Sequence, residues 1–133
     1  MVAFGNEQMR VLFVDDELSV RELLAAFCQH LEISYATADN ASEALRVLES
    51  EMFSLIVTDV EMPGMSGVRL ASEVRKRYPQ IGVFAFSGVS LSPLDAQQSA
   101  RLFDKVFRKP EDYSRLIAEV MKYLAIRQYP FLA

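Results

Sequence analysis

Acidic, hydroxyl and ammonium side chains each stand at the end of a short apolar run, in a pattern suited to cation binding and phosphoryl transfer. The first run is followed by Asp15 and Asp16, the third by Asp59, the fourth by Ser87 and the fifth by Lys109. Neighbouring carboxylates repel one another unless a cation compensates them, and Mg²⁺ prefers such oxygen ligands. An aspartate can attack phosphorus, while a lysine and a hydroxyl can bind phosphoryl oxygens. These residue types predict Mg²⁺-dependent phosphorylation of Asp59, if the fold brings them together.

The elements that must position these side chains alternate along the sequence. Short apolar runs predict five strands, at residues 11–14, 33–38, 55–57, 81–86 and 106–107. Helical spacing predicts five helices that follow these strands in turn, of which the one over residues 92–102 has the weakest pattern. Strands that are apolar throughout and alternate with helices predict an α/β fold, a doubly wound five-stranded parallel sheet with five helices on both faces. Right-handed crossovers then bring all the strand C-termini, and the five candidate residues, to one edge of the sheet.

Local signals refine the helices. Ser19 with Glu22 predicts a capping box for the first helix, and Asn40 with Glu43 predicts a cap for the second. The inward face of the first helix is expected to carry Leu23, Leu24, Phe27 and Leu31. Cys28 lies among them, so it is expected to be buried and unreactive.

Each candidate residue also has a purely structural interpretation. Asp15 and Asp16 are suited to capping a helix, Asp59 to a turn, and Ser87 beside a glycine to another turn. Lys109 alone would be read as a solvated lysine. The functional interpretation rests on their combination, because separate strand ends each supply a group that the same chemistry needs.

Composition limits the classes of function. The 133 residues suffice for one domain, and a net charge of -4 argues against a nucleic-acid-binding surface. One cysteine excludes an intrachain disulfide, and one histidine, His30, excludes a multi-histidine metal site. No apolar run is long enough for a membrane span, and the first ten residues lack a signal-peptide pattern, so a cytoplasmic location is expected.

The motifs resemble the receiver domain of response regulators of bacterial two-component systems, of the chemotaxis-regulator-like kind. The resemblance runs from Met9 to Leu124 and is carried by residues 14–17, 59–67, 87–88 and 109–110. It implies a flavodoxin-like fold with strand order 2-1-3-4-5. It also implies an N-terminal extension over residues 1–8, a receiver domain over 9–126, and a tail or the start of a linker over 127–133.

The resemblance also assigns roles. It implies that Asp59 is the phosphoacceptor, with Ser87 and Lys109 completing the site. The implied cofactor is Mg²⁺, held by Asp59, by Asp16 directly, by Asp15 through water and by the backbone carbonyl of Glu61. The phosphodonor would be a sensor histidine kinase or a phosphotransfer protein, and the output an unknown domain or protein. Such a domain is not an enzyme beyond its own phosphorylation and dephosphorylation.

The sequence departs from the family pattern three residues before the lysine. Val106 stands where the family usually has an aromatic residue that turns inward on phosphorylation. Phe107 is adjacent, but a shift of one residue along a strand points a side chain to the opposite face. The resemblance allows a homodimer through the face of the fourth helix, fifth strand and fifth helix. Val106, the residue that departs from the family pattern, belongs to the fifth strand and so to this face.

Three alternatives differ in kind from a phosphorylated receiver. A haloacid-dehalogenase-type phosphatase should have an Asp-x-Asp pattern after its first strand, whereas this chain has Asp15-Asp16-Glu17. A non-phosphorylated pseudo-receiver should lack a key residue, and none is missing. A flavin-binding protein should have a first loop rich in Ser, Thr and Gly, which this chain lacks.

Overall fold

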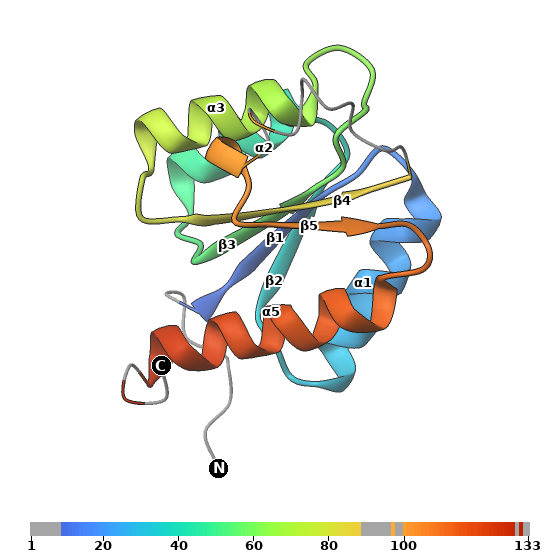
Figure 1. Ribbon diagram of the computed structural model, residues 1–133, viewed down its shortest axis with the longest axis vertical. Coiled ribbons are helices and arrows are strands. Elements are labelled where there is room, and N and C mark those ends of the chain that lie inside the picture. The colour runs from blue at the N-terminus through green and yellow to red at the C-terminus, as the bar shows by residue number, and fades with distance from the viewer. Residues whose placement is uncertain (1–8, 89–96, 98–99, 130, 132–133) are drawn as a thin grey trace.

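Nine helices and strands, whose bounds lie within the described residues, are arranged around one sheet. The computed structural model describes residues 9–88, 97, 100–129 and 131 (Figure 1). The elements in chain order are β1 (Val11–Val14), α1 (Leu18–His30), β2 (Tyr35–Ala38), α2 (Ala41–Ser50), β3 (Leu55–Thr58), α3 (Gly67–Arg77), β4 (Gly82–Ser87), β5 (Lys105–Arg108) and α5 (Tyr113–Gln128). No helix in this described part of the chain is long and apolar enough to cross a membrane.

The sheet has the predicted order. All four strand pairs are parallel, and the order is β2-β1-β3-β4-β5. This confirms the flavodoxin-like fold. Of the predicted helix over residues 92–102, only residues 97 and 100–102 are described, and these are helical.

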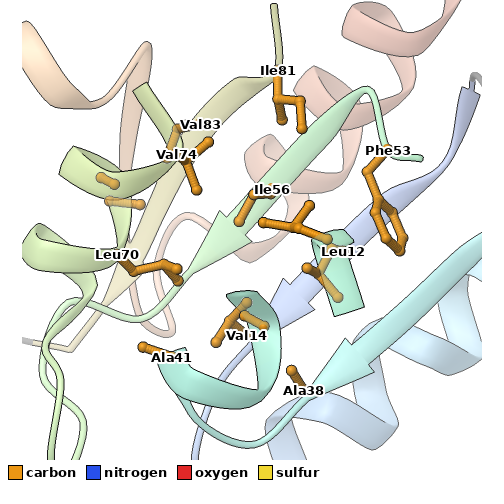
Figure 2. Packing of buried hydrophobic residues seen from close by; sticks show 14 of the residues in the cluster. Leu12, Val14, Ala38, Ala41, Phe53, Ile56, Leu70, Val74, Ile81 and Val83 are labelled. Atoms are coloured by element: carbon orange, nitrogen blue, oxygen red, sulfur yellow. The ribbon is translucent and has the colours of Figure 1, made fainter. Parts of the chain in front are cut away.

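Helices cover both faces of the sheet. Figure 1 shows α2 and α3 on one face and α1 and α5 on the other. Every residue of β1, β3 and β4 is buried, because both faces of these central strands are covered. Figure 2 shows the layer beneath α2 and α3, where Leu70 and Val74 of α3 point toward Ile56 and Val83 of the sheet. Each buried aliphatic side chain of this kind contributes about 2 kcal/mol to stability.

The first helix differs from the prediction at its start. α1 begins at Leu18, and Glu17 occupies the cap position without a side-chain hydrogen bond. The prediction of a capping box at Ser19 and Glu22 was therefore wrong, because Ser19 already lies inside the helix. A local bond sets the start instead, since the Glu17 N–H donates to Asp15 Oδ1 at 2.9 Å and closes a turn after β1.

The buried face of α1 is also narrower than predicted. Leu24 and Cys28 are buried, and burial raises the pKa of the Cys28 thiol to about 12, so this cysteine is the inert residue expected. Leu23 and Phe27, predicted to point inward, are 47% and 37% exposed. They lie four residues apart on a stripe beside the buried one, and this stripe faces the start of α5, because Phe27 contacts the Tyr113 ring.

Other local predictions are confirmed. The Asn40 side chain accepts the Glu43 N–H at 2.8 Å and caps α2. The sequence also predicts that the basic residues 75–77 complement the partial negative charge of a helix C-terminus, and they occupy the last turn of α3. Helical spacing predicts an inward face of α5 with Tyr113 and four aliphatic residues; Leu116, Ile117, Val120 and Leu124 are buried, whereas Tyr113 is only partly buried.

Candidate functional site

The C-terminal edge of the sheet brings together residues that are far apart in the sequence. Asp15 directly follows β1, Asp59 follows β3, Ser87 ends β4 and Lys109 follows β5. The hydrogen bonding of the sheet extends into this edge, because the Asp59 N–H donates to the Val14 carbonyl at 2.8 Å and the Lys109 N–H to the Ser87 carbonyl at 2.9 Å. The parallel sheet thus places these residues at one rim, as predicted.

Lys109 is at the centre of the side-chain cluster. Its Nζ lies 2.6 Å from Asp15 Oδ2 and 3.3 Å from Asp59 Oδ2, so it bonds both carboxylates. The Lys109 side chain is 13% exposed, and those of Asp15 and Asp59 are 3% and 8% exposed. Charge-assisted bonds of this kind, partly shielded from water, are stronger than those on an open surface.

The burial and the charges perturb the titration of Asp59 and Lys109. Burial raises the pKa of Asp59, and the charge of Asp15 adds to that rise, while Lys109 opposes it. Burial alone would lower the pKa of Lys109, but its bond to Asp15 and the charges of Asp15 and Asp59 raise it overall. Lys109 therefore remains a cation at neutral pH and compensates two buried acids.

Glu17 is a site residue that the sequence reasoning missed. Carboxylate oxygens of Asp15, Glu17 and Asp59 all lie within 4.8 Å of one another, and Glu17 Oε1 is 3.8 Å from Lys109 Nζ. The signal was visible in the sequence, because Glu17 directly follows the aspartate pair. The Asp16 carboxylate is exposed and is not part of this group of three.

The three carboxylates suit a hard divalent cation. Mg²⁺ binds oxygen ligands at about 2.0–2.1 Å, so two ligands on opposite sides of it lie about 4.2 Å apart. The oxygens here all lie within 4.8 Å of one another, near enough for one ion to be shared among them. Their number and charge thus fit Mg²⁺.

The loop after β3 is held by its own hydrogen bonds. The Thr58 hydroxyl donates to the Asp59 carbonyl at 2.9 Å, and the Glu61 N–H donates to Asp59 Oδ1 at 3.3 Å. These bonds fix Asp59 on the side of the rim that Lys109 reaches.

Ser87, the hydroxyl residue predicted for this edge, lies at the end of β4 and is 3% exposed.

Residues 106 and 107 have the environments that strand geometry predicted. Val106 is 38% exposed, whereas Phe107 is 2% exposed. The Phe107 ring packs inward against Phe84, with ring centres 5.5 Å apart. Phe107 therefore does not replace an aromatic side chain at position 106.

Comparisons with known proteins agree on one family. The family model of the response regulator receiver domain matches residues 11–121. Response regulator protein PilR of Pseudomonas aeruginosa is 33% identical over 121 residues, which cover 90% of this chain and 27% of PilR. Response regulator receiver protein CpdR of Brucella abortus is 29% identical over 115 residues, which cover 86% of this chain and 96% of CpdR.

A solved structure gives the same result. The crystal structure of response regulator protein TrrA from Thermotoga maritima, in complex with Mg²⁺-BeF, matches with a TM-score of 0.77 at 33% identity. The match covers 86% of this chain and 97% of that one. The chain thus spans nearly all of CpdR and TrrA but about a quarter of PilR.

Proposed function

This chain belongs to the response regulator receiver domain family, and from that premise we propose that it accepts a phosphoryl group on Asp59 in a Mg²⁺-dependent reaction. The observation that carries the proposal is the position of Lys109 Nζ, which bonds both Asp15 and Asp59 in a largely buried cluster. Such a cluster supplies a nucleophilic carboxylate, acidic ligands and a fixed cation, which are the needs of phosphoryl transfer.

Asp59 acts as the nucleophile. One of its carboxylate oxygens forms the new bond to phosphorus, and the bond from phosphorus to the donor atom breaks, with its electron pair leaving on the donor. The transfer converts the carboxylate, of charge -1, into an acyl phosphate whose charge is about -2. Lys109 neutralises part of this charge, and the Ser87 hydroxyl donates to a phosphoryl oxygen. When bound, Mg²⁺ supplies the remaining neutralisation of the phosphoryl oxygens.

The metal ligands that we propose are the carboxylates of Asp15, Asp16 and Asp59 and the backbone carbonyl of Glu61. The proximity of Glu17 to Asp15 and Asp59 adds it to the candidates. The similarity to TrrA, whose structure was solved with Mg²⁺-BeF, supports Mg²⁺ as the ion. Asp15 then has two competing partners, since Lys109 Nζ already lies 2.6 Å from it.

The phosphodonor, location, domain bounds and output that we propose are those implied by membership of the family. The donor is a phosphohistidine on a sensor histidine kinase or a phosphotransfer protein in the cytoplasm. The receiver domain spans residues 9–126, preceded by an extension over 1–8 and followed by a tail or linker over 127–133. Its output is a further domain or protein, and homodimerisation through the face of β5 and α5 is one form that output can take. The chain catalyses only its own phosphorylation and dephosphorylation, and it contacts neither nucleic acid nor membrane directly.

Intact-mass measurement tests the proposal. We expect the purified chain to gain the mass of one phosphoryl group when incubated with Mg²⁺ and acetyl phosphate. Asp59→Asn should gain none, and a chelator should prevent the gain in the wild type. An unmodified wild type, or an equal gain on Asp59→Asn, would contradict phosphorylation of Asp59 and leave a pseudo-receiver as the better description.

A second experiment separates the metal ligands. Asp16→Asn and Glu17→Gln each remove one negative charge at neighbouring positions, and Mg²⁺ affinity is measured by calorimetry on both. A direct ligand at Asp16 predicts a loss of about tenfold or more for Asp16→Asn and a smaller loss for Glu17→Gln. The reverse order would assign the ligand to Glu17.

A further inference from the structure

A row of aromatic rings leads from Lys109 to the surface of α1. Lys109 Nζ lies 5.7 Å from the centre of the Phe86 ring, within the range of a cation–π contact. Phe86 packs against Tyr113 with ring centres 6.2 Å apart, and Tyr113 meets Phe27 edge to face at 5.2 Å. The first step is thus a contact of a cation with a ring, and the next two are contacts between neighbouring rings.

The row connects three elements and runs from the interior to the surface. Phe86 is in β4, Tyr113 is the first residue of α5, and Phe27 is in α1. Phe86 is 4% exposed, while Phe27 is 37% exposed. The Tyr113 hydroxyl donates to the Leu23 carbonyl at 3.2 Å, which ties the start of α5 to the backbone of α1. In Figure 1 these two helices lie on the same face of the sheet.

At position 106 of β5, where an aromatic side chain responds to phosphorylation in the family, this protein has a small side chain. Val106 has no ring, and the Phe107 ring instead contacts Phe84, with the Arg115 guanidinium 5.1 Å from its centre. The aromatic contacts that reach Lys109 thus lead through Phe86, on the face covered by α1 and α5.

We propose that Phe86 positions the Lys109 ammonium and, through Tyr113 and Phe27, couples phosphorylation of Asp59 to the surface formed by α1 and the start of α5. The coupling rests on the proposed function. A new phosphoryl group draws Lys109 away from Asp15 and changes the place of the cation over the Phe86 ring. Because interiors are close-packed, a shift of Phe86 requires Tyr113 and then Phe27 to shift as well.

The chain contains no tryptophan, so one introduced tryptophan reports its own position without background. Phe27→Trp places the reporter at the exposed end of the row, and Met52→Trp places a control reporter at an exposed apolar position between α2 and β3, away from the row. Each is mixed with Mg²⁺ and acetyl phosphate, and fluorescence is followed while intact mass records the extent of phosphorylation. We expect the emission of Phe27→Trp to change in step with the added mass, and that of Met52→Trp to change less.

Phe86→Leu in the Phe27→Trp background tests the route. Leucine keeps the site apolar but removes the ring, so the fluorescence change per phosphoryl group gained should fall to less than half of that seen with Phe86 present. A full mass gain with silent Phe27→Trp emission would overturn the coupling, as would a response that survives Phe86→Leu unchanged. Failure of the wild type to gain mass would instead overturn the proposed function, and the coupling with it.

A measurement on the wild type guards against a reporter that disturbs folding. The ring resonances of Tyr113, identified by their loss in Tyr113→Phe, should shift when Asp59 is phosphorylated. Asp59→Asn under the same conditions should show no shift. Unchanged Tyr113 resonances in a chain that mass measurement shows to be phosphorylated would overturn the proposal.

Discussion

Gly67 packs directly against the backbone of Asp59. A Cβ atom at position 67 would lie 2.0 Å from the Asp59 carbonyl oxygen and 2.9 Å from the Val60 Cα. The Gly67 N–H also donates to the Val60 carbonyl at 2.8 Å. Because Gly67 is the first residue of α3, this contact sets how closely that helix approaches the loop after β3, which carries Asp59.

Gly67→Ala should therefore destabilise the fold and slow phosphorylation. Alanine favours a helix by about 1 kcal/mol over glycine, but the backbone clash is larger, so we expect a net loss of about 2 kcal/mol. Urea unfolding measures the loss, and mass gain with acetyl phosphate measures the rate. Gly88→Ala is the stability control, since a Cβ there meets no atom within 4 Å. Equal stability of the two variants would contradict the packing argument.

Asp59→Asn should stabilise the metal-free protein. Burial raises the pKa of Asp59, which means that the folded state penalises its charged form. Asparagine has nearly the same shape without the charge, so a gain of about 1 kcal/mol in the free energy of unfolding is expected at neutral pH. Urea unfolding in the presence of a chelator measures it, and a less stable Asn variant would refute the prediction.

The difference in stability between Asp59→Asn and the wild type should depend on pH. The pKa of Asp59 is higher in the folded than in the unfolded chain, so protonation of this carboxyl favours folding. The wild type loses that contribution as the pH rises through the folded-state pKa. The advantage of Asp59→Asn should thus be full at neutral pH and shrink as the pH falls through the raised pKa toward about 3.9, the usual aspartate value. An advantage that stays constant over this range would argue against Asp59 as its source.

Arg10 should be a stabilising residue at the opposite edge of the sheet. Its guanidinium donates to Ser34 Oγ at 3.1 Å, pairs with Glu51 and lies 4.8 Å from the centre of the Phe53 ring. Arg10→Met keeps much of the apolar stem but loses these contacts, so a loss of about 1–2 kcal/mol is expected in urea unfolding.

Arg77→Met is the matched control for Arg10. Arg77 is 49% exposed and, among the residues that the structure describes, forms an ion pair only with Glu73 on the same helix, at 3.4 Å. Exposed pairs of this kind contribute about 0.5 kcal/mol or less. Losses of equal size in the two variants would show that the network around Arg10 adds nothing beyond a surface ion pair.

Glu32→Gly should stabilise the end of α1. Glu32 has a φ of 57°, and the Ile33 N–H donates to the Cys28 carbonyl at 2.8 Å in the pattern of a helix-terminating Schellman motif. Glycine adopts this conformation without strain, and a gain of about 0.5–1 kcal/mol is expected after allowing for its larger unfolded-state entropy. Thermal unfolding measures it. Glu32→Ala keeps the Cβ and should give no gain, so an equal gain from alanine would exclude backbone strain as the cause.

The sequence by itself determined the parallel α/β arrangement, the edge of the sheet at which the site lies, and most of the residue types found there. Apolar strands that alternate with helices leave few topologies, and parallel crossovers force the strand ends of Asp15, Asp59 and Lys109 to one edge. Strand parity likewise separated Val106 from Phe107, because successive side chains point to opposite faces. These inferences hold because they depend on local periodicity and chain geometry.

Only the tertiary structure decided which neighbours these side chains meet. A turn closed by Asp15 started α1 earlier than the Ser19 signal predicted and carried Glu17 to within 3.8 Å of Lys109. Leu23 and Phe27 remain partly exposed, since apolar spacing alone does not tell how wide a surface the helix covers. The contacts of Phe86 with Lys109 and Tyr113 depend on how three elements pack, and no single segment of sequence encodes that distance.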